Sequence, residues 1–153
     1  MRSTCFTDKE AIGSIIRECQ VCYVGMVDKD NTPYVVPFNF AYEDGYIYLH
    51  SAHDGRKMDI LKNNNRVCVT FSTGHELRNQ SEGVACSYSM KFRSVMAFGH
   101  VEFIEEFDRK VELLNKVMKH YTGKEFTFSK PSIHEVATYR VVIEEMTGKK
   151  LGY

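Results

Sequence analysis

Apolar and polar residues alternate along much of this chain, and alternation with a period of two is typical of β-strands. The predicted strands cover 20–27, 34–42, 46–51, 66–72, 92–104 and 136–146, of which 66–72 is predicted to be buried. Apolar residues recur at helical spacing over 7–18, 55–63 and 105–121. The pattern therefore predicts a mainly β fold, a β-barrel with flanking helices.

Turn and capping residues separate these elements. Polar residues at 28–32 predict a turn, and Asp44-Gly45 predicts a tight hairpin between two strands. Thr7 with Glu10 predicts a capping box at the first helix, and Asp54 is the predicted N-cap of the second.

Three further features shape the expected barrel. Gly99 stands in the middle of the longest predicted strand, where a bulge or bend lets a barrel turn a corner and close. The polar stretch 73–83 has no period and predicts a mobile loop. The basic tail at 147–150 is expected to be disordered, beyond the last strand.

Composition limits the classes of partner. The 153 residues favour one domain covering 1–153, which is long enough to bury roughly 70% of its unfolded surface. Twenty basic and twenty acidic residues give zero formal charge, which argues against a general nucleic-acid binder or a polybasic membrane anchor. No stretch has the apolar length of a signal peptide or membrane span, so we expect a cytoplasmic protein with small-molecule partners.

Five cysteines fit a reducing compartment in which thiols stay free. The spacing of Cys19 and Cys22 is compatible with a redox pair or with half of a zinc site. No second cysteine pair or matched histidine pair completes tetrahedral coordination, and His50 with His53 lacks a third ligand at a suitable spacing. We therefore expect neither a functional dithiol nor a metal site.

The second predicted helix begins with two cations, Arg56 and Lys57. Basic residues at a helix N-terminus oppose the macrodipole, at a cost of about 0.3–1 kcal/mol each, unless an anion lies beside them. The backbone N–H groups of the first turn and the two side chains would converge on a phosphate. The alternative is a solvated helix start, whose charges only keep the surface wet.

Pro37 interrupts an otherwise good strand. Proline removes a hydrogen-bond donor from the ladder, so it belongs on an edge strand or at an interruption. Backbone groups near Val36 and Phe38 are then free to bind the carbonyls and ring nitrogens of a flat heteroaromatic ligand. Flavin mononucleotide (FMN) has the length and chemistry to join these groups to a phosphate at Arg56 and Lys57.

Three segments in this order resemble one known family: PYVVPFNFAY with YIYLHSAHDGRKMDIL, then KFRSVMAFGHVEFIE, and finally ATYRVVIEEMTGK. The chain resembles the nitroimidazole-resistance (Nim) proteins, which belong to the pyridoxamine 5'-phosphate oxidase-like, FMN-binding split β-barrels. The resemblance covers most of the chain up to Gly148. It implies a flavin-binding homodimer with the cofactor at the subunit interface.

The resemblance also implies roles for individual residues. It places His50, Ser51 and Ala52 along the flavin ribityl chain and ring, and makes His50 the candidate catalytic residue at the redox-active face. It places Ser94 and Val95 near the pyrimidine ring. The predicted cofactor-binding set is Val36, Pro37, Phe38, Asn39, His50, Ser51, Ala52, Arg56, Lys57, Ser94 and Val95.

The expected activity is that of an FMN-dependent oxidoreductase, with nitroimidazoles or other nitroaromatic compounds as acceptors and a small-molecule electron donor. The alternative is a flavin- or haem-binding module for storage or sensing, and FAD or a deazaflavin are alternatives to FMN. True pyridoxamine-phosphate oxidases end in an Arg-Leu-x-Pro type segment, whereas this chain ends in Lys-Lys-Leu-Gly-Tyr. Oxidation of pyridoxamine phosphate is therefore not expected.

Overall fold

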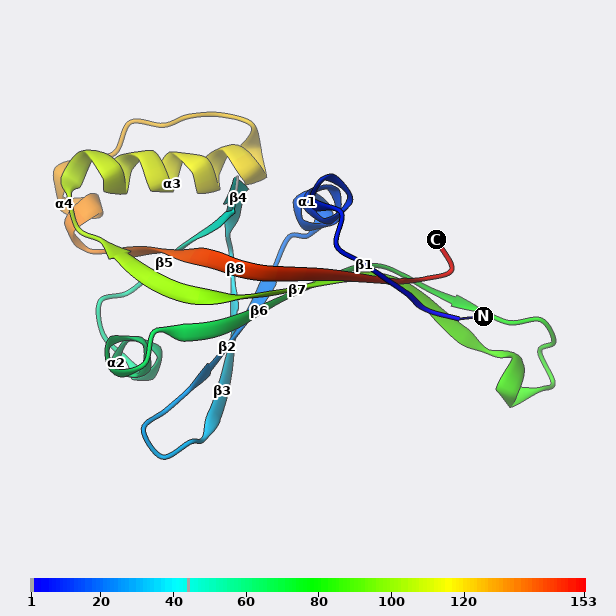
Figure 1. Cartoon of the computed structure of the whole chain (residues 1–153). Coiled ribbons are helices and arrows are strands. Elements are labelled where there is room, and N and C mark those ends of the chain that lie inside the picture. Colours follow the sequence, from blue (N-terminus) through cyan, green and yellow to red (C-terminus); the bar gives the residue numbers. More distant parts are fainter. Residues whose placement is uncertain (1, 44) are drawn as a thin grey trace.

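A computed structural model describes residues 2–43 and 45–153, and within them eight strands form one antiparallel sheet (Figure 1). The strand order is β3-β2-β6-β7-β8-β5-β4, and β1 pairs with β8 beside this path. The strands are β1 (Thr4–Phe6), β2 (Cys22–Val27), β3 (Pro33–Phe38), β4 (Ala41–Glu43), β5 (Tyr46–Ser51), β6 (Arg66–Arg78), β7 (Ser89–Ile104) and β8 (Ala137–Leu151). The mainly β prediction is confirmed.

Helices cover the outside of the sheet. They are α1 (Lys9–Glu18), α2 (Arg56–Asn63), α3 (Phe107–Thr122) and the short α4 (Lys130–His134), whereas the 3₁₀ turn η1 (Ala85–Ser87) lies in the link between β6 and β7. Figure 1 shows α3 lying over β4, β5 and the start of β8, with α2 and α4 near the same end of β7 and β8. Among the described residues, none of the helices combines the length and apolar character that crossing a bilayer requires.

The sheet curls around an apolar interior. Phe38 on edge strand β3 makes an edge-on ring contact with Tyr139 on β8, at 6.2 Å between centroids. Phe40, in the link between β3 and β4, meets Phe71 on β6 at 5.0 Å. These contacts join strands that are not neighbours in the sheet, so its two faces are an enclosed interior and an outer surface.

Two predictions about special backbone positions are confirmed. Pro37 lies on β3, the edge strand, where its missing N–H removes nothing from the sheet. Gly99 lies where the register between β7 and β8 shifts. Phe98 pairs with Glu145, but Gly99 pairs with Ile143, so Glu144 is skipped. A Cβ at Gly99 would collide with the carbonyl oxygen of Val142, so the close approach of the strands requires glycine.

Both predicted helix caps are wrong by one residue. The N-cap of α1 is Asp8, whose carboxylate accepts a hydrogen bond from Ala11 N at 2.8 Å, and not Thr7. The N-cap of α2 is Gly55, whose φ of 102° favours glycine, and not Asp54. Of the predicted Asp44-Gly45 turn, Asp44 lies outside the described residues.

The loop predicted over 73–83 is wrong for 73–78 and right for 79–83, which lie outside helices and strands, and the disorder predicted over 147–150 is wrong. Strand β6 continues to Arg78 and pairs with β7 beyond an irregularity between Thr73 and Glu76, and the two strands project past the rest of the sheet (Figure 1). The tail pairs with β7 on one side and β1 on the other. Both segments consist mostly of polar residues and glycine, so they pair through the backbone without a hydrophobic period in the sequence.

Candidate functional site

The start of α2 is the first part of the candidate site. Gly55 is its N-cap, and no side chain accepts a hydrogen bond from the N–H groups of the first turn. Arg56 and Lys57 follow at once, as the sequence indicates. An uncapped, cationic helix N-terminus is a suitable environment for an anion.

The two cations differ in how far the protein itself neutralises them. The Arg56 guanidinium lies 3.6 Å from an Asp28 carboxylate oxygen and 4.6 Å from the Tyr34 ring centroid. Backbone hydrogen bonds from Thr32 and then Asp30, with Arg56 alongside, lower the pKa of Asp28. The Lys57 ammonium lies 5.5 Å from the Phe38 ring, and no carboxylate within the described ranges pairs with it. Lys57 is therefore the more available charge.

Ser51 fixes the end of β5 to the barrel and to α2. Its hydroxyl donates to Ala52 O at 2.9 Å, accepts from the Tyr139 hydroxyl at 3.1 Å and lies 3.5 Å from Met58 Sδ. Burial raises the pKa of Tyr139 to about 12, so this phenol remains a donor. Sequence reasoning missed Tyr139, whose only signal is an aromatic residue early in the last strand.

His50 carries a buried atom whose hydrogen-bonding capacity is unused. Its Nδ1 is buried, and no described residue donates to it or accepts from it. Burial lowers the pKa of His50, so the imidazole is neutral at pH 7. A buried polar atom without a partner carries a free-energy cost that a polar ligand group would remove.

The remaining predicted residues divide into two groups. Val36, Pro37, Phe38 and Asn39 lie on or directly after β3, and through Phe38 they neighbour Lys57. Ser94 and Val95 lie on β7 and pair instead with residues of β6 and β8. Val95 is fully buried and lies between paired residues of β6 and β8, so within this chain it offers no exposed surface to a ligand.

The Cys19 and Cys22 pair has no reactive character. Both side chains are buried, and Cys19 Sγ donates to Ile15 O at 3.3 Å. Burial raises the pKa of both thiols, that of Cys22 to about 12, so neither is a thiolate near pH 7. The described part of the chain holds no group of three His, Cys, Asp or Glu side chains arranged for a metal ion.

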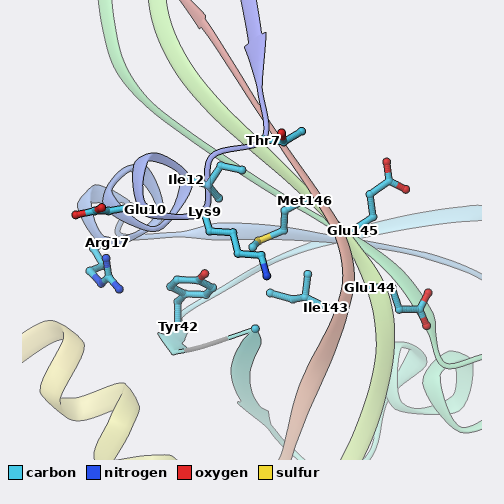
Figure 2. Close-up of a pocket in the computed structure, with 11 residues that line it drawn as sticks. Thr7, Lys9, Glu10, Ile12, Arg17, Tyr42, Ile143, Glu144, Glu145 and Met146 are labelled. Atoms are coloured by element: carbon cyan, nitrogen blue, oxygen red, sulfur yellow. The ribbon is translucent and has the colours of Figure 1, made fainter.

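A cavity of about 500 Å³ lies away from this site, between α1, the β4–β5 turn and β8. Figure 2 shows Lys9 reaching across it above the Tyr42 ring, with Ile143 and Met146 of β8 opposite. It is lined by Thr7, Lys9, Glu10, Ile12, Arg17, Tyr42, Gly45, Ile143, Glu144, Glu145 and Met146. None of these is a predicted site residue.

The family described as pyridoxamine 5'-phosphate oxidase matches residues 8–150. The chain belongs to this family. Among curated proteins, none matches the sequence significantly.

Several solved structures are similar to this chain over most of its length. A "putative 5-nitroimidazole antibiotic resistance protein" from Bacteroides thetaiotaomicron is 43% identical, with a TM-score of 0.87, over 97% of this chain and 87% of that one. The flavocytochrome Anf3 from Azotobacter vinelandii is 24% identical, with a TM-score of 0.82, over 97% and 70% of the chains. The FAD and heme binding protein from Mycobacterium smegmatis is 16% identical, with a TM-score of 0.84, over 97% and 74%. The resemblance to Nim proteins and the split β-barrel fold are confirmed.

The lowered pKa of His50 predicts a pH dependence of stability. In the unfolded chain His50 binds a proton near pH 6.5, whereas in the folded protein it does so only at lower pH. The contribution of neutral His50 to the free energy of unfolding is therefore fully present above about pH 6.5, and it is lost as the pH decreases toward the folded-state pKa. Between pH 8 and pH 5.5, the free energy of unfolding of flavin-free protein, measured with urea, should decrease less for His50→Gln than for wild type. The exposed His75→Gln should behave as wild type, and an unchanged loss in His50→Gln would contradict the assignment.

Proposed function

We propose that this protein binds FMN and acts as a flavin-dependent oxidoreductase that reduces nitroaromatic compounds such as nitroimidazoles. The observation that carries the proposal is the uncapped start of α2, with Lys57 unpaired by any described carboxylate. It stands in a chain that is 43% identical to a relative whose name refers to 5-nitroimidazole resistance. Storage or sensing by a bound flavin or haem is the competing proposal, since two relatives of lower identity are named for such groups.

The residues present fit the cofactor at two points. The first-turn N–H groups of α2, Arg56 and Lys57 would hold a phosphate, because they offer both directed donors and positive charge. The orphaned Nδ1 of His50 would take a hydrogen bond from a bound polar group, or give one to it. A bound flavin would supply the electron transfer, while these residues bind and orient it.

The overall reaction balances with a reduced nicotinamide as donor. The donor gives a hydride, which carries two electrons, and the solvent gives one proton. The nitro group accepts two electrons and two protons and becomes a nitroso group and water. His50, held neutral by burial, adds no positive charge beside the acceptor.

We also propose that a second copy of the chain completes the site. Two apolar rows cross the outer face of four strands: Pro37, Tyr23, Thr70 and Met96 form one, and Val35, Gly25, Cys68 and Phe98 form the other. Val35 is 61% exposed, Tyr23 48% and Met96 42%, and such a contiguous apolar surface favours association.

Ser94 connects this face to the cofactor. It lies two residues before Met96 on β7, so its side chain shares the outer face with the apolar rows. A dimer through this face would bring Ser94 to the interface, where family resemblance puts the flavin. This accounts for its separation from the α2 corner of the same chain.

Turnover is tested by anaerobic stopped-flow spectroscopy of FMN-loaded protein. Mixing with NADH or NADPH should bleach the flavin absorbance, and adding a 5-nitroimidazole should restore it with consumption of the nitro compound. Flavin that stays oxidised with both donors, or reduced flavin that ignores the acceptor, would support the storage or sensing module instead.

Replacing Lys57 by Ala should weaken FMN binding by about tenfold, because about 1.5 kcal/mol of charge-assisted hydrogen bonding is lost. Riboflavin has no phosphate, so its affinity should change by less than about twofold. Fluorescence titration with both flavins measures this difference, and Lys119→Ala, an exposed lysine on α3, is the control. Equal losses for FMN and riboflavin would show that the phosphate lies elsewhere.

The dimer predicts that Met96→Glu forms monomers, because the charge would be buried in an apolar interface. Sedimentation velocity should show a dimer for wild type and a monomer for Met96→Glu, with weakened FMN binding. Phe126→Glu changes an apolar residue that is equally exposed but lies in the link after α3, and it should remain dimeric. A wild-type monomer that binds FMN would refute the shared site.

A further inference from the structure

A cavity of about 390 Å³ lies at the end of the sheet where β7 runs into α3 and β8 begins, close to α2 and α4 (Figure 1). Its volume is within the range of about 300–1,000 Å³ that is typical of small-molecule sites. It is lined by His53, Met58, Lys62, Phe103, Ile104, Glu105, Lys110, His134, Ala137 and Thr138. None of these belongs to the predicted flavin-binding set.

Lys110 is a buried cation in the lining of this cavity. The residue is 7% exposed, and its ammonium donates to the carbonyl oxygen of Val136 at 2.7 Å. An ammonium has three N–H donors, so two remain beyond this bond. Among residues 2–43 and 45–153, no carboxylate forms an ion pair with Lys110. A buried charge without a counter-ion is rare in folded proteins, because its desolvation is not repaid.

The surroundings add to the positive potential at Lys110. The residue lies in the first turn of α3, near the positive end of the helix dipole. The carboxylate of Glu106 caps this helix, but its two oxygens accept from Asp108 N and Arg109 N at 3.0 Å each. Lys62 lies on the cavity wall, where Glu105 is the one acidic lining residue. The cavity is therefore short of negative charge.

Apolar side chains form much of the remaining wall, and one edge is closed by a hydrogen bond. Met58, Phe103, Ile104 and Ala137 supply most of the apolar lining. His53 Nε2 lies 2.7 Å from His134 O and so ties the segment before α2 to α4. A ligand matched to these walls has an apolar body and a single anionic end.

We propose that this cavity binds a small organic carboxylate with an aromatic or branched apolar body. The carboxylate accepts hydrogen bonds from the two free donors of Lys110, and the apolar body contacts Met58 and Phe103. A phosphate dianion is less suited, because one ammonium and apolar walls supply few of the donors that its three oxygens need. The proposal does not depend on the flavin or on the proposed reductase activity.

Benzoate is the probe, and isothermal titration of the full-length protein, with and without FMN, measures its binding. Benzyl alcohol keeps the ring without the charge, and inorganic phosphate keeps a charge without the ring. Both should bind at least tenfold more weakly than benzoate. Lys110→Met keeps the length and apolar stem of the side chain and should weaken benzoate at least tenfold. Lys119→Met, an exposed lysine of the same helix, should bind benzoate as wild type does.

Two further measurements separate a ligand-binding lysine from a structural one. If Lys110 serves a ligand, benzoate should raise the unfolding temperature of wild type and leave that of Lys110→Met unchanged, because only a ligand that binds the folded protein stabilises it. Crystals grown with 4-bromobenzoate should show anomalous bromine density in the cavity. The proposal is overturned if the bromine lies elsewhere or is absent, or if phosphate binds the FMN-loaded protein as tightly as benzoate does. It is equally overturned if a folded Lys110→Met retains full benzoate affinity.

Discussion

Strands β7 and β8 pair along almost their whole length, from Phe92 opposite Leu151 to Ile104 opposite Thr138. The outer edge of β8 then holds β5 at one end and β1 at the other. His50 is placed by its pairing with Thr138, and Val136, which accepts from Lys110, directly precedes the same strand. Both sites proposed for the molecule are therefore positioned by where β8 begins.

The bulge opposite Gly99 gives this pair of strands its bend, because one strand carries an extra residue there. The curled sheet brings Phe38 of the edge strand against Tyr139 of β8. The Tyr139 hydroxyl in turn donates a hydrogen bond to Ser51 and so fixes the end of β5, shortly before α2. Packing inside the barrel therefore helps to position the α2 N-terminus, together with the contact of His53 with His134 O in the loop before the helix.

The sequence was sufficient where a residue type has one physical use. Pro37 has to avoid the interior of a sheet, and Gly99 has to admit a close backbone, so both positions were predictable. Arg56 and Lys57 oppose a helix dipole, which singled them out without any tertiary information. The barrel itself was expected from alternation together with family resemblance.

The sequence was insufficient where backbone pairing acts without an apolar signal, or where a contact is long-range. Glu76 of β6 pairs with Lys91 of β7 where the two strands project past the sheet, and their side chains form an ion pair at 3.2 Å. Nothing in the local sequence pattern at Glu76 indicates a strand. The bond from Tyr139 to Ser51 joins residues 88 positions apart. Lys110 did leave a signal, because it lies four residues before Leu114 on the buried stripe of α3, where a lysine is out of place.

The starts of α2 and α3 solve the same electrostatic problem in opposite ways. At α3, Glu106 occupies the first N–H groups, so positive charge reaches the cavity only through the side chain of Lys110. At α2, Gly55 has no side chain to offer, and only Met58 N of the first turn donates, to Gly55 O, so the N–H groups of Arg56 and Lys57 stay available. Several directed donors with added charge favour a dianion such as a phosphate monoester, whereas one buried ammonium among apolar walls favours a monoanion. The different caps therefore allow two anions at the same end of the barrel without competition between them.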